Sequence, residues 1–224
     1  MPASSRHRPA ARFILEGKIW EAETLVFLAS QCGPGDVVHA GTYFGDFLPA
    51  LSRAVDADAR VWAFEPSQEN FRCAEITLKL NAIGNVALTH AALGARSAEA
   101  LLCTSTGGKR SAGGSSAIDS EKKEGRIYET VRVVALDDII PADRQISIIQ
   151  LDVEKYEQQA LAGALAIIRR CRPLLVLETL PLDESWFEAN ILSLGYEHVA
   201  RVDVNYVLRA KPAHQSPEAI TMPS

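Results

Sequence analysis

Short apolar runs alternate with longer segments whose apolar residues recur three or four positions apart. Apolar runs of about four to eight residues bounded by turn residues predict buried strands, whereas the wider spacing predicts helices with one apolar face. The expected strands are residues 37–40, 61–64, 86–91, 98–103, 131–136, 146–151 and 174–177, followed by a terminal antiparallel pair at 196–202 and 205–208. The expected helices are residues 22–30, 47–55, 69–81, 158–171 and 184–194.

This alternation indicates an α/β fold built on a mostly parallel sheet. Residues 146–151 form a nearly continuous apolar run, which is typical of a central parallel strand buried on both faces. In such sheets, ligands bind beyond the carboxyl ends of the strands, near the point where the strand order reverses. Polar residues that directly follow an apolar strand are therefore the candidates for function.

The pattern also divides the chain into segments. We expect a flexible N-terminal segment at residues 1–15, one folded domain at 16–210, and a disordered tail at 211–224 that is rich in proline and poor in apolar residues. Residues 104–125 are rich in Gly, Ser and Lys, so a loop between two hairpin strands is expected there. That loop is either a lid over the substrate or a mobile loop without function.

Charge and cysteine content narrow the classes of partner. The formal net charge of -5 gives no general attraction to nucleic acid or to an anionic membrane surface, so we expect a small-molecule partner and neither of those two. No segment approaches the roughly 18 apolar residues of a membrane span, and no apolar leader follows the N-terminal arginines. The cysteines are scattered, as in a reducing compartment. We expect a cytoplasmic protein, and the sequence leaves a homodimer open.

The first expected strand runs into a loop in which Gly41 and Gly45 are four positions apart. Such a loop brings backbone N–H groups close to a ligand and then starts a helix. A dinucleotide fingerprint has the pattern G-x-G-x-x-G, and here Tyr43 replaces the middle glycine and crowds a pyrophosphate. The loop therefore favours a cofactor without a diphosphate, and a tight packing turn is the alternative.

Acidic residues end two further strands. Glu65 lies about twenty residues after Gly45, where a carboxylate can accept hydrogen bonds from both ribose hydroxyls of an adenosine cofactor. A solvated acid at a strand end is the alternative reading of Glu65. Asp152 and Glu154 follow the strand at 146–151, and Asp152 is the better placed of the two to orient a cofactor or an acceptor. Alternatively, they serve as a helix N-cap and a partner of the helix dipole.

Four passages, taken in order, resemble one known family. They are the glycine loop from Gly35 to Gly45, Phe64-Glu65-Pro66-Ser67 with Asn70, Gly113-Gly114-Ser115-Ser116 leading to Leu136-Asp137-Asp138-Ile139, and Asp152-Val153-Glu154-Lys155-Tyr156-Glu157 with the later run to Glu178. Together they resemble the FkbM-type methyltransferases, which use S-adenosylmethionine (SAM). The resemblance implies a Rossmann-like, seven-stranded class I methyltransferase sheet with helices on both faces and an antiparallel terminal hairpin. It also implies SAM as cofactor and O-methylation of a sugar or natural product.

The residues expected to bind the cofactor come from several strand ends. They are Glu21, His39, Gly41, Thr42, Tyr43, Gly45, Glu65, Pro66, Ser67, Asn70, Ala92 and Asp152. The chain departs from the family pattern at His39, where an acid is usual, near Tyr43, where Asn is usual, and at Lys155, where Gly is usual. The usual acid helps to hold the positive methionine part of SAM, so Glu21 or Asp152 is expected to supply that charge. His39 is then either a neutral hydrogen-bonding strand residue or a site residue.

Methyl transfer from a sulfonium needs alignment, exclusion of water and, for a hydroxyl acceptor, a base. We expect Asp152 to be this base or to orient the acceptor, with Glu154 and Glu178 as alternates, and we expect no metal. N-methylation of an amine and a SAM-binding scaffold without turnover are the alternatives to O-methyl transfer. A nucleotide-dependent oxidoreductase is the enzyme class that Tyr43 disfavours.

Overall fold

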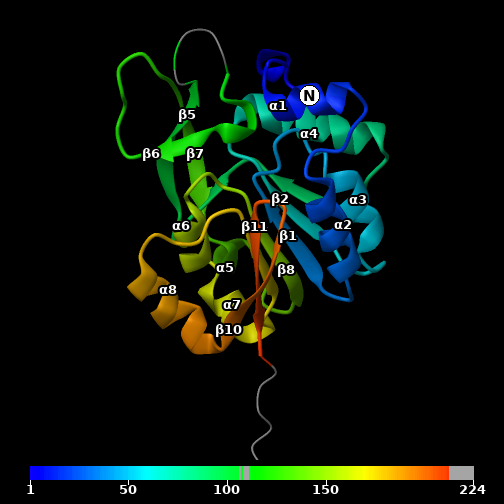
Figure 1. The fold of residues 1–224 in the computed structure, drawn as a ribbon, viewed down its shortest axis with the longest axis vertical. Helices are drawn as coiled ribbons and strands as arrows, with labels where there is room; N and C mark the ends of the chain where they lie inside the picture. Colours follow the sequence, from blue (N-terminus) through cyan, green and yellow to red (C-terminus); the bar gives the residue numbers. More distant parts are fainter. Residues whose placement is uncertain (106, 108–110, 212–224) are drawn as a thin grey trace, which may run out of the picture.

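The computed structural model describes residues 1–105, 107 and 111–211, and its centre is a seven-stranded sheet in the order β10-β11-β9-β8-β1-β2-β3 (Figure 1). The strands from β9 to β3 are parallel, whereas β11 is antiparallel to both β9 and β10. These strands are β1 (Asp36–Ala40), β2 (Val61–Phe64), β3 (Val86–Thr89), β8 (Ile146–Leu151), β9 (Leu174–Leu177), β10 (Tyr196–Val202) and β11 (Asn205–Ala210). The expected sheet with its terminal antiparallel hairpin is confirmed.

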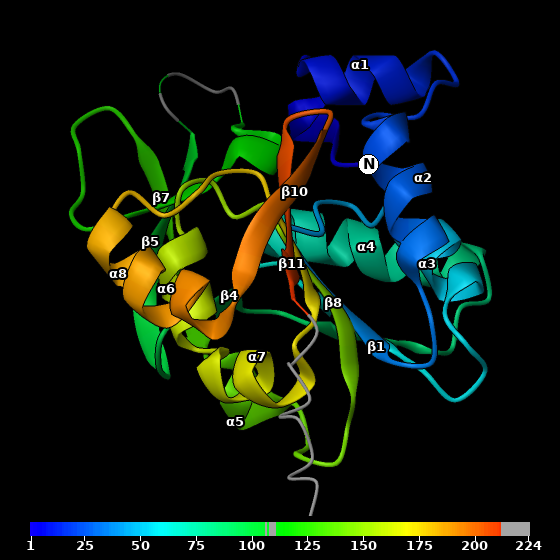
Figure 2. The ribbon, with the colours of Figure 1, turned by 60° about the horizontal axis from the view of Figure 1, so that its bottom comes forward.

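Helices cover both faces of this sheet, as Figures 1 and 2 show. Because successive side chains of a strand point to opposite faces, Val37 joins the core that contains Leu28, and Val38 joins the core that contains Ile168. The helices are α1 (Pro9–Leu15), α2 (Ala22–Gln31), α3 (Leu48–Ala54), α4 (Gln68–Leu80), α5 (Leu136–Ile139), α6 (Glu157–Ala162), α7 (Leu165–Cys171) and α8 (Glu184–Asn190). The sequence-based expectation of helices on both faces is confirmed.

A second sheet of four strands, in the order β4-β7-β5-β6, lies beside the main sheet. Its strands are β4 (Ala92–Leu93), β5 (Ala98–Ser105), β6 (Ala117–Asp119) and β7 (Ile127–Val134). The expected antiparallel pairing of the segments near 98–103 and 131–136 is confirmed by β5 and β7. The prediction of a plain loop at 104–125 is wrong in part, because β6 pairs with β5 inside that segment.

Some predicted boundaries also differ from the structure. The expected helix 158–171 is two helices, α6 and α7, separated at Gly163 and Ala164. A Cβ atom on Gly163 would lie 2.0 Å from the backbone oxygen of Gly94, so this close approach requires glycine. Residues 1–15, expected as a flexible segment, contain the turn η1 (Ala3–Ser5) and α1. Of the expected disordered tail, residues 212–224 lie outside the described residues.

No helix within the described ranges is both long and apolar enough to cross a membrane.

Asp36 is a buried charge at the start of β1. Its side chain is 2% exposed and accepts hydrogen bonds from Trp62 Nε1 (2.7 Å) and Arg144 Nε (2.8 Å). Burial acts to raise the pKa of Asp36, but the hydrogen bonds from Arg144 and Trp62 outweigh it and lower the pKa. We therefore expect Asp36→Ala to lower the free energy of unfolding by about 3 kcal/mol in urea titrations at neutral pH.

The stabilisation by Asp36 has a defined dependence on pH. Because the folded-state pKa is lowered, the stabilisation is present above the pKa of aspartate in the unfolded chain and is lost as the pH falls through the folded-state value. The unfolding curves of wild type and Asp36→Ala should therefore converge in acid. Equal midpoints at neutral pH would show that these hydrogen bonds contribute no net stability.

Candidate functional site

The carboxyl ends of β1, β2, β8 and β9 carry most of the candidate residues. The loop after β1 begins at Gly41, whose backbone lies directly against that of Asp152, the residue after β8. Gly41 has a φ of +84°, and a Cβ atom there would lie 1.8 Å from the backbone oxygen of Asp152. Only glycine allows this contact. It joins the glycine loop and the acidic end of β8 into one site.

Glu65 follows β2 and ties the glycine loop to the start of α4. Its buried carboxylate accepts hydrogen bonds from the backbone N–H groups of Tyr43 (2.8 Å) and Ser67 (2.8 Å) and from Asn70 Nδ2 (3.3 Å). Burial raises the pKa of Glu65 to about 7, although these hydrogen bonds act in the opposite direction. An ionised carboxylate offers about four lone-pair sites. The three hydrogen bonds use three of these sites, so Glu65 keeps acceptor capacity for the ribose.

A narrow cavity of about 40 Å³ lies beside Glu65, and we call it the apolar cavity. Its lining includes Ala40, Phe64, Pro66, Asn70, Ala92, Leu93, Leu102, Ile118 and Tyr156. A slot with apolar walls and a buried carboxylate at its edge is suited to a flat aromatic base attached to a sugar.

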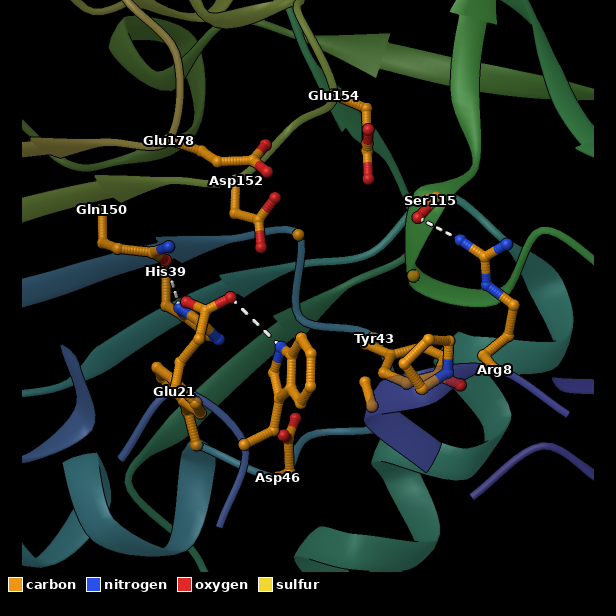
Figure 3. A pocket seen from close by; sticks show the side chains of 16 residues that line it. Arg8, Glu21, His39, Tyr43, Asp46, Ser115, Gln150, Asp152, Glu154 and Glu178 are labelled. Carbon is orange, nitrogen blue, oxygen red and sulfur yellow. Dashed lines mark hydrogen bonds between the residues drawn. The ribbon is translucent and has the colours of Figure 1, made fainter. Parts of the chain in front are cut away.

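A larger cavity of about 230 Å³ adjoins the apolar cavity, and we call it the acidic cavity (Figure 3). Gly41, Gly114 and Asp152 line both cavities, so the two meet where β1 and β8 end. The described residues that line the acidic cavity include five carboxylates: Glu21, Asp46, Asp152, Glu154 and Glu178. The cavity is therefore suited to a positively charged ligand group.

The acids at the ends of β8 and β9 affect one another's ionisation. Burial, and next the charge of Glu178, raise the pKa of Asp152 well above its usual value. The same two causes raise the pKa of Glu154. One oxygen from each of the three carboxylates lies within 4.8 Å of the other two, and they are the one group of described residues close enough to hold a metal ion. Carboxylates this close hold protons more tightly, which suits one of them to proton transfer.

The other side of the acidic cavity carries two more acids and a tryptophan. Burial raises the pKa of Asp46 to about 6 and also raises the pKa of Glu21. Glu21 accepts a hydrogen bond from Trp20 Nε1 (3.1 Å), as Figure 3 shows, and another from Asn205 Nδ2 (3.3 Å). Glu21 is therefore oriented toward the cavity by residues from two distant parts of the chain.

His39 lies at the edge of the acidic cavity and is 4% exposed. Its Nδ1 forms a hydrogen bond of 2.5 Å with Gln150 Oε1, and its ring stacks on Phe47 with centroids 5.6 Å apart. Burial lowers the pKa of His39 to about 4, so the imidazole is uncharged at neutral pH. His39 thus combines both roles considered for it, a neutral strand residue and a residue that lines the site.

The N-terminal segment covers part of the acidic cavity. Arg8, Pro9 and Ala10 belong to its lining. Ser5 Oγ lies 2.6 Å from the hydroxyl oxygen of Tyr43 in a hydrogen bond, and Arg8 Nη2 donates to Ser115 Oγ (2.5 Å; Figure 3). These two hydrogen bonds therefore hold the N-terminal segment to the glycine loop and to the loop between β5 and β6, which contains Ser115.

Most of the predicted site residues line one of the two cavities. Those that do are Glu21, His39, Gly41, Tyr43, Glu65, Pro66, Asn70, Ala92, Asp152, Glu154 and Glu178. The remaining three support the loops: Thr42 Oγ1 donates to the carbonyl oxygen of His39, Gly45 packs against α4, and the Ser67 N–H binds Glu65.

Four residues of the acidic cavity with charged, hydroxyl or amide side chains were not among the predicted site residues: Arg8, Asp46, Ser115 and Gln150. Gln150 does carry a signal, since it is a polar residue inside an apolar strand and pairs in register with His39. Asp46 directly follows the loop glycine. Arg8 and Ser115 are brought together from positions 107 residues apart, and no local pattern reports such a contact.

Comparison with known proteins assigns the family. A model described as the methyltransferase FkbM domain matches residues 39–203, which include Gly41, Gly45, Glu65, Asp152 and Glu178. The match starts after α1 and α2, so the N-terminal cover of the acidic cavity lies outside it. A search of curated proteins found no match.

One solved methyltransferase structure shares the fold, with a TM-score above 0.5. The methyltransferase FkbM from Methylobacillus flagellatus KT is 16% identical with a TM-score of 0.53, and the alignment covers 91% of this chain and 60% of that one. A putative O-methyltransferase from Klebsiella pneumoniae is 12% identical with a TM-score of 0.49, covering 85% and 79%. The present chain thus spans 60% of the first structure's length. The family model covers most of the main sheet and the strand ends that line the two cavities. The chain therefore belongs to the FkbM methyltransferase family.

Proposed function

We propose that the protein transfers the methyl group of SAM to a hydroxyl group of a small molecule, such as a sugar or another natural product. SAM is the methyl donor of this methyltransferase family. One observation carries the proposal: the apolar cavity beside Glu65 and the acidic cavity meet at Gly41 and Asp152. SAM that extends from one cavity into the other would place its sulfur atom, which joins the adenosine and amino-acid ends, next to Asp152.

The residues of the two cavities fit the parts of SAM. The apolar cavity suits the adenine ring, and the buried Glu65 suits the ribose hydroxyls. The carboxylates of the acidic cavity suit the positive sulfonium and ammonium groups. Bound SAM supplies a methyl group on a sulfur that is already a good leaving group. The remaining work of the chain is to align the acceptor, exclude water and take a proton.

Asp152 is the proposed base. Among the described residues it is the one carboxylate that lines both cavities, and burial and the charge of Glu178 raise its pKa, which makes its ionised form a stronger proton acceptor. Glu154 and Glu178 lie close enough to accept that proton instead or to orient the acceptor. The expectation that the reaction needs no metal stays a prediction.

N-methylation of an amine is the second candidate. It is favoured by the carboxylates of the acidic cavity, which would stabilise a cationic amine before it loses a proton. Acceptors that differ only in carrying a hydroxyl or an amine at one position separate the two reactions.

The first test is calorimetric titration with SAM and with its demethylated product S-adenosylhomocysteine (SAH). We expect micromolar binding of both, followed by transfer of isotope-labelled methyl to hydroxyl acceptors in a paired hydroxyl and amine panel. Transfer only to amines would favour the second candidate. Tight binding without transfer to any acceptor would instead support a SAM-binding scaffold, and no binding would contradict the proposal.

Removal of the N-terminal cover is expected to speed release of the cofactor. A chain that begins at residue 16 loses Arg8 and the contact of Ser5 with Tyr43, so one wall of the acidic cavity opens. We expect SAH to dissociate about tenfold faster, because each lost contact of about 1 kcal/mol acts mainly on the dissociation rate. Stopped-flow fluorescence of Trp20, which lines the cavity, reports this rate.

Phe13→Ala provides the control for this deletion. Phe13 lies in α1 and contacts Trp20 and Lys18, but it does not line the acidic cavity. Release from this variant should stay within about twofold of wild type. An unchanged release rate in the shortened chain would show that the segment does not retain the cofactor.

The cytoplasmic location stays a prediction. A homodimer and a lid function for residues 104–125 stay alternatives that the sequence leaves open. Residues 106 and 108–110 of the suggested lid lie outside the described residues.

A further inference from the structure

His39 and Gln150 form a buried polar pair on two central strands. They are direct partners in the register of β1 and β8, and their side chains are 4% and 3% exposed. The hydrogen bond between His39 Nδ1 and Gln150 Oε1 fixes how both groups face the acidic cavity (Figure 3). Because the amide oxygen can only accept, Nδ1 carries the proton of the neutral ring.

This bond leaves one donor and one acceptor without partners. In the neutral ring with a proton on Nδ1, the other nitrogen, Nε2, carries a lone pair and accepts. The Nε2 amide group of Gln150 donates. Across the part of the chain that the structure describes, neither atom has a hydrogen-bond partner, yet both residues line the acidic cavity. Neither atom is among the fully enclosed unpaired atoms of the described residues, so both are open to the acidic cavity, where they would pair with a ligand that carries a donor and an acceptor side by side.

The position of His39 and Gln150 determines which part of the cofactor they face. If SAM is the cofactor, as the proposed function holds, its adenosine end occupies the apolar cavity beside Glu65. The amino-acid end then extends past Gly41 into the acidic cavity, where His39 and Gln150 lie. An α-amino acid carries an ammonium donor and a carboxylate acceptor on one carbon atom. The ammonium group would pair with the acceptor His39 Nε2, and the carboxylate would pair with the donor Gln150 Nε2.

We propose that His39 Nε2 accepts a hydrogen bond from the α-ammonium group of the cofactor, while Gln150 Nε2 donates one to its carboxylate. The hydrogen bond between the two side chains holds both groups in place. This neutral pair recognises a zwitterion without adding charge to a cavity that already contains five carboxylates. A further acid at position 39 would add a like charge beside those carboxylates.

The test compares two ligands that differ at one end. SAH carries the amino-acid end, whereas 5′-methylthioadenosine has the same adenosine and sulfur without it. In wild type, SAH should bind more tightly than methylthioadenosine. His39→Phe keeps a ring to stack on Phe47 but removes both nitrogens. We expect it to weaken SAH binding by about 10- to 100-fold, as for hydrogen bonds to charged groups, and to leave methylthioadenosine within about twofold.

Two further variants complete the comparison. Gln150→Met removes the amide at nearly constant length and should also weaken SAH selectively. Glu65→Gln alters the adenosine end and should weaken both ligands by similar factors. The ratio of the two affinities therefore separates recognition of the amino-acid end from a general loss of binding.

A measurement on the unaltered chain covers the case in which the variants do not fold. In ¹⁵N-histidine NMR spectra, His39 should show a protonated Nδ1 and an unprotonated Nε2, and the Nε2 resonance should shift with SAH but not with methylthioadenosine. Equal shifts with both ligands, or equal affinity changes in His39→Phe, would overturn the inference and leave the proposed function standing. Wild-type protein that binds neither ligand would refute both.

Discussion

Glu65→Ala is expected to weaken the binding of SAH by about 100-fold or more. The variant loses the acceptor for the ribose hydroxyls and also leaves the backbone N–H groups of Tyr43 and Ser67 without their partner. An unsatisfied buried donor costs about 1–3 kcal/mol, and a hydrogen bond to a charged group is worth a similar amount. The two effects together come to about 3 kcal/mol or more, which exceeds the roughly 2.8 kcal/mol that corresponds to a 100-fold change. Calorimetric titration measures the loss directly.

Glu129→Ala is the matched control for Glu65. The carboxylate of Glu129 also accepts a backbone N–H at the start of α4, from Gln68 (3.0 Å), but it lines neither cavity. The control should bind SAH as wild type does. If Glu65→Ala binds as tightly as Glu129→Ala while both remain folded, the adenosine end does not lie beside Glu65.

Asp152→Asn is expected to lower the rate of methyl transfer to a hydroxyl by about 100-fold or more at saturating SAM, because a positioned base contributes at least that factor. The base acts in its ionised form. Since burial and Glu178 raise the pKa of Asp152, the wild-type rate should rise with pH as this group loses its proton, and the variant should lack that rise. Single-turnover rates measured across pH, with SAH affinity measured in parallel, test both statements.

Glu178→Gln sharpens the assignment of the base. Removing the charge of Glu178 leaves burial as the main cause that raises the pKa of Asp152, so the rate profile should move to lower pH without disappearing. If Asp152→Asn keeps full turnover with SAM bound, Asp152 has no part in proton transfer. Loss of turnover in Glu178→Gln alone would assign that role to Glu178.

The central parallel strands of the main sheet were predictable because they are short, mostly apolar runs with a polar or glycine boundary. Residues 61–64, 146–151 and 174–177 coincide with β2, β8 and β9. A strand that is buried on both faces needs apolar side chains at nearly every position, so it is recognisable in the sequence as a nearly continuous apolar run. Since parallel strands end on one side of the sheet, the carboxylates that follow β2, β8 and β9 could also be placed near one another.

The second sheet and the cover of the site could not be predicted in this way. β6 has only three residues, all partly exposed, so it lacks an apolar run. The division between α6 and α7 depends on the approach of Gly163 to Gly94, which is a contact between distant segments. Arg8 enters the site from a polar N-terminal segment for the same reason. Tertiary contacts decide these features, and a local pattern does not contain them.

The glycine contact at the end of β1 determines which parts of the site can move. Since the backbone of Gly41 leaves no space against Asp152, and Asp152 N–H donates to the carbonyl oxygen of Ala40 (3.0 Å), the two strand ends form one rigid floor under both cavities. On the proposed function, opening for cofactor exchange then falls to the roof, which includes Arg8, Pro9 and Ala10 and the loop with Gly114 and Ser115. A change of acceptor preference can then arise in the roof while the floor proposed to hold the methyl donor stays the same.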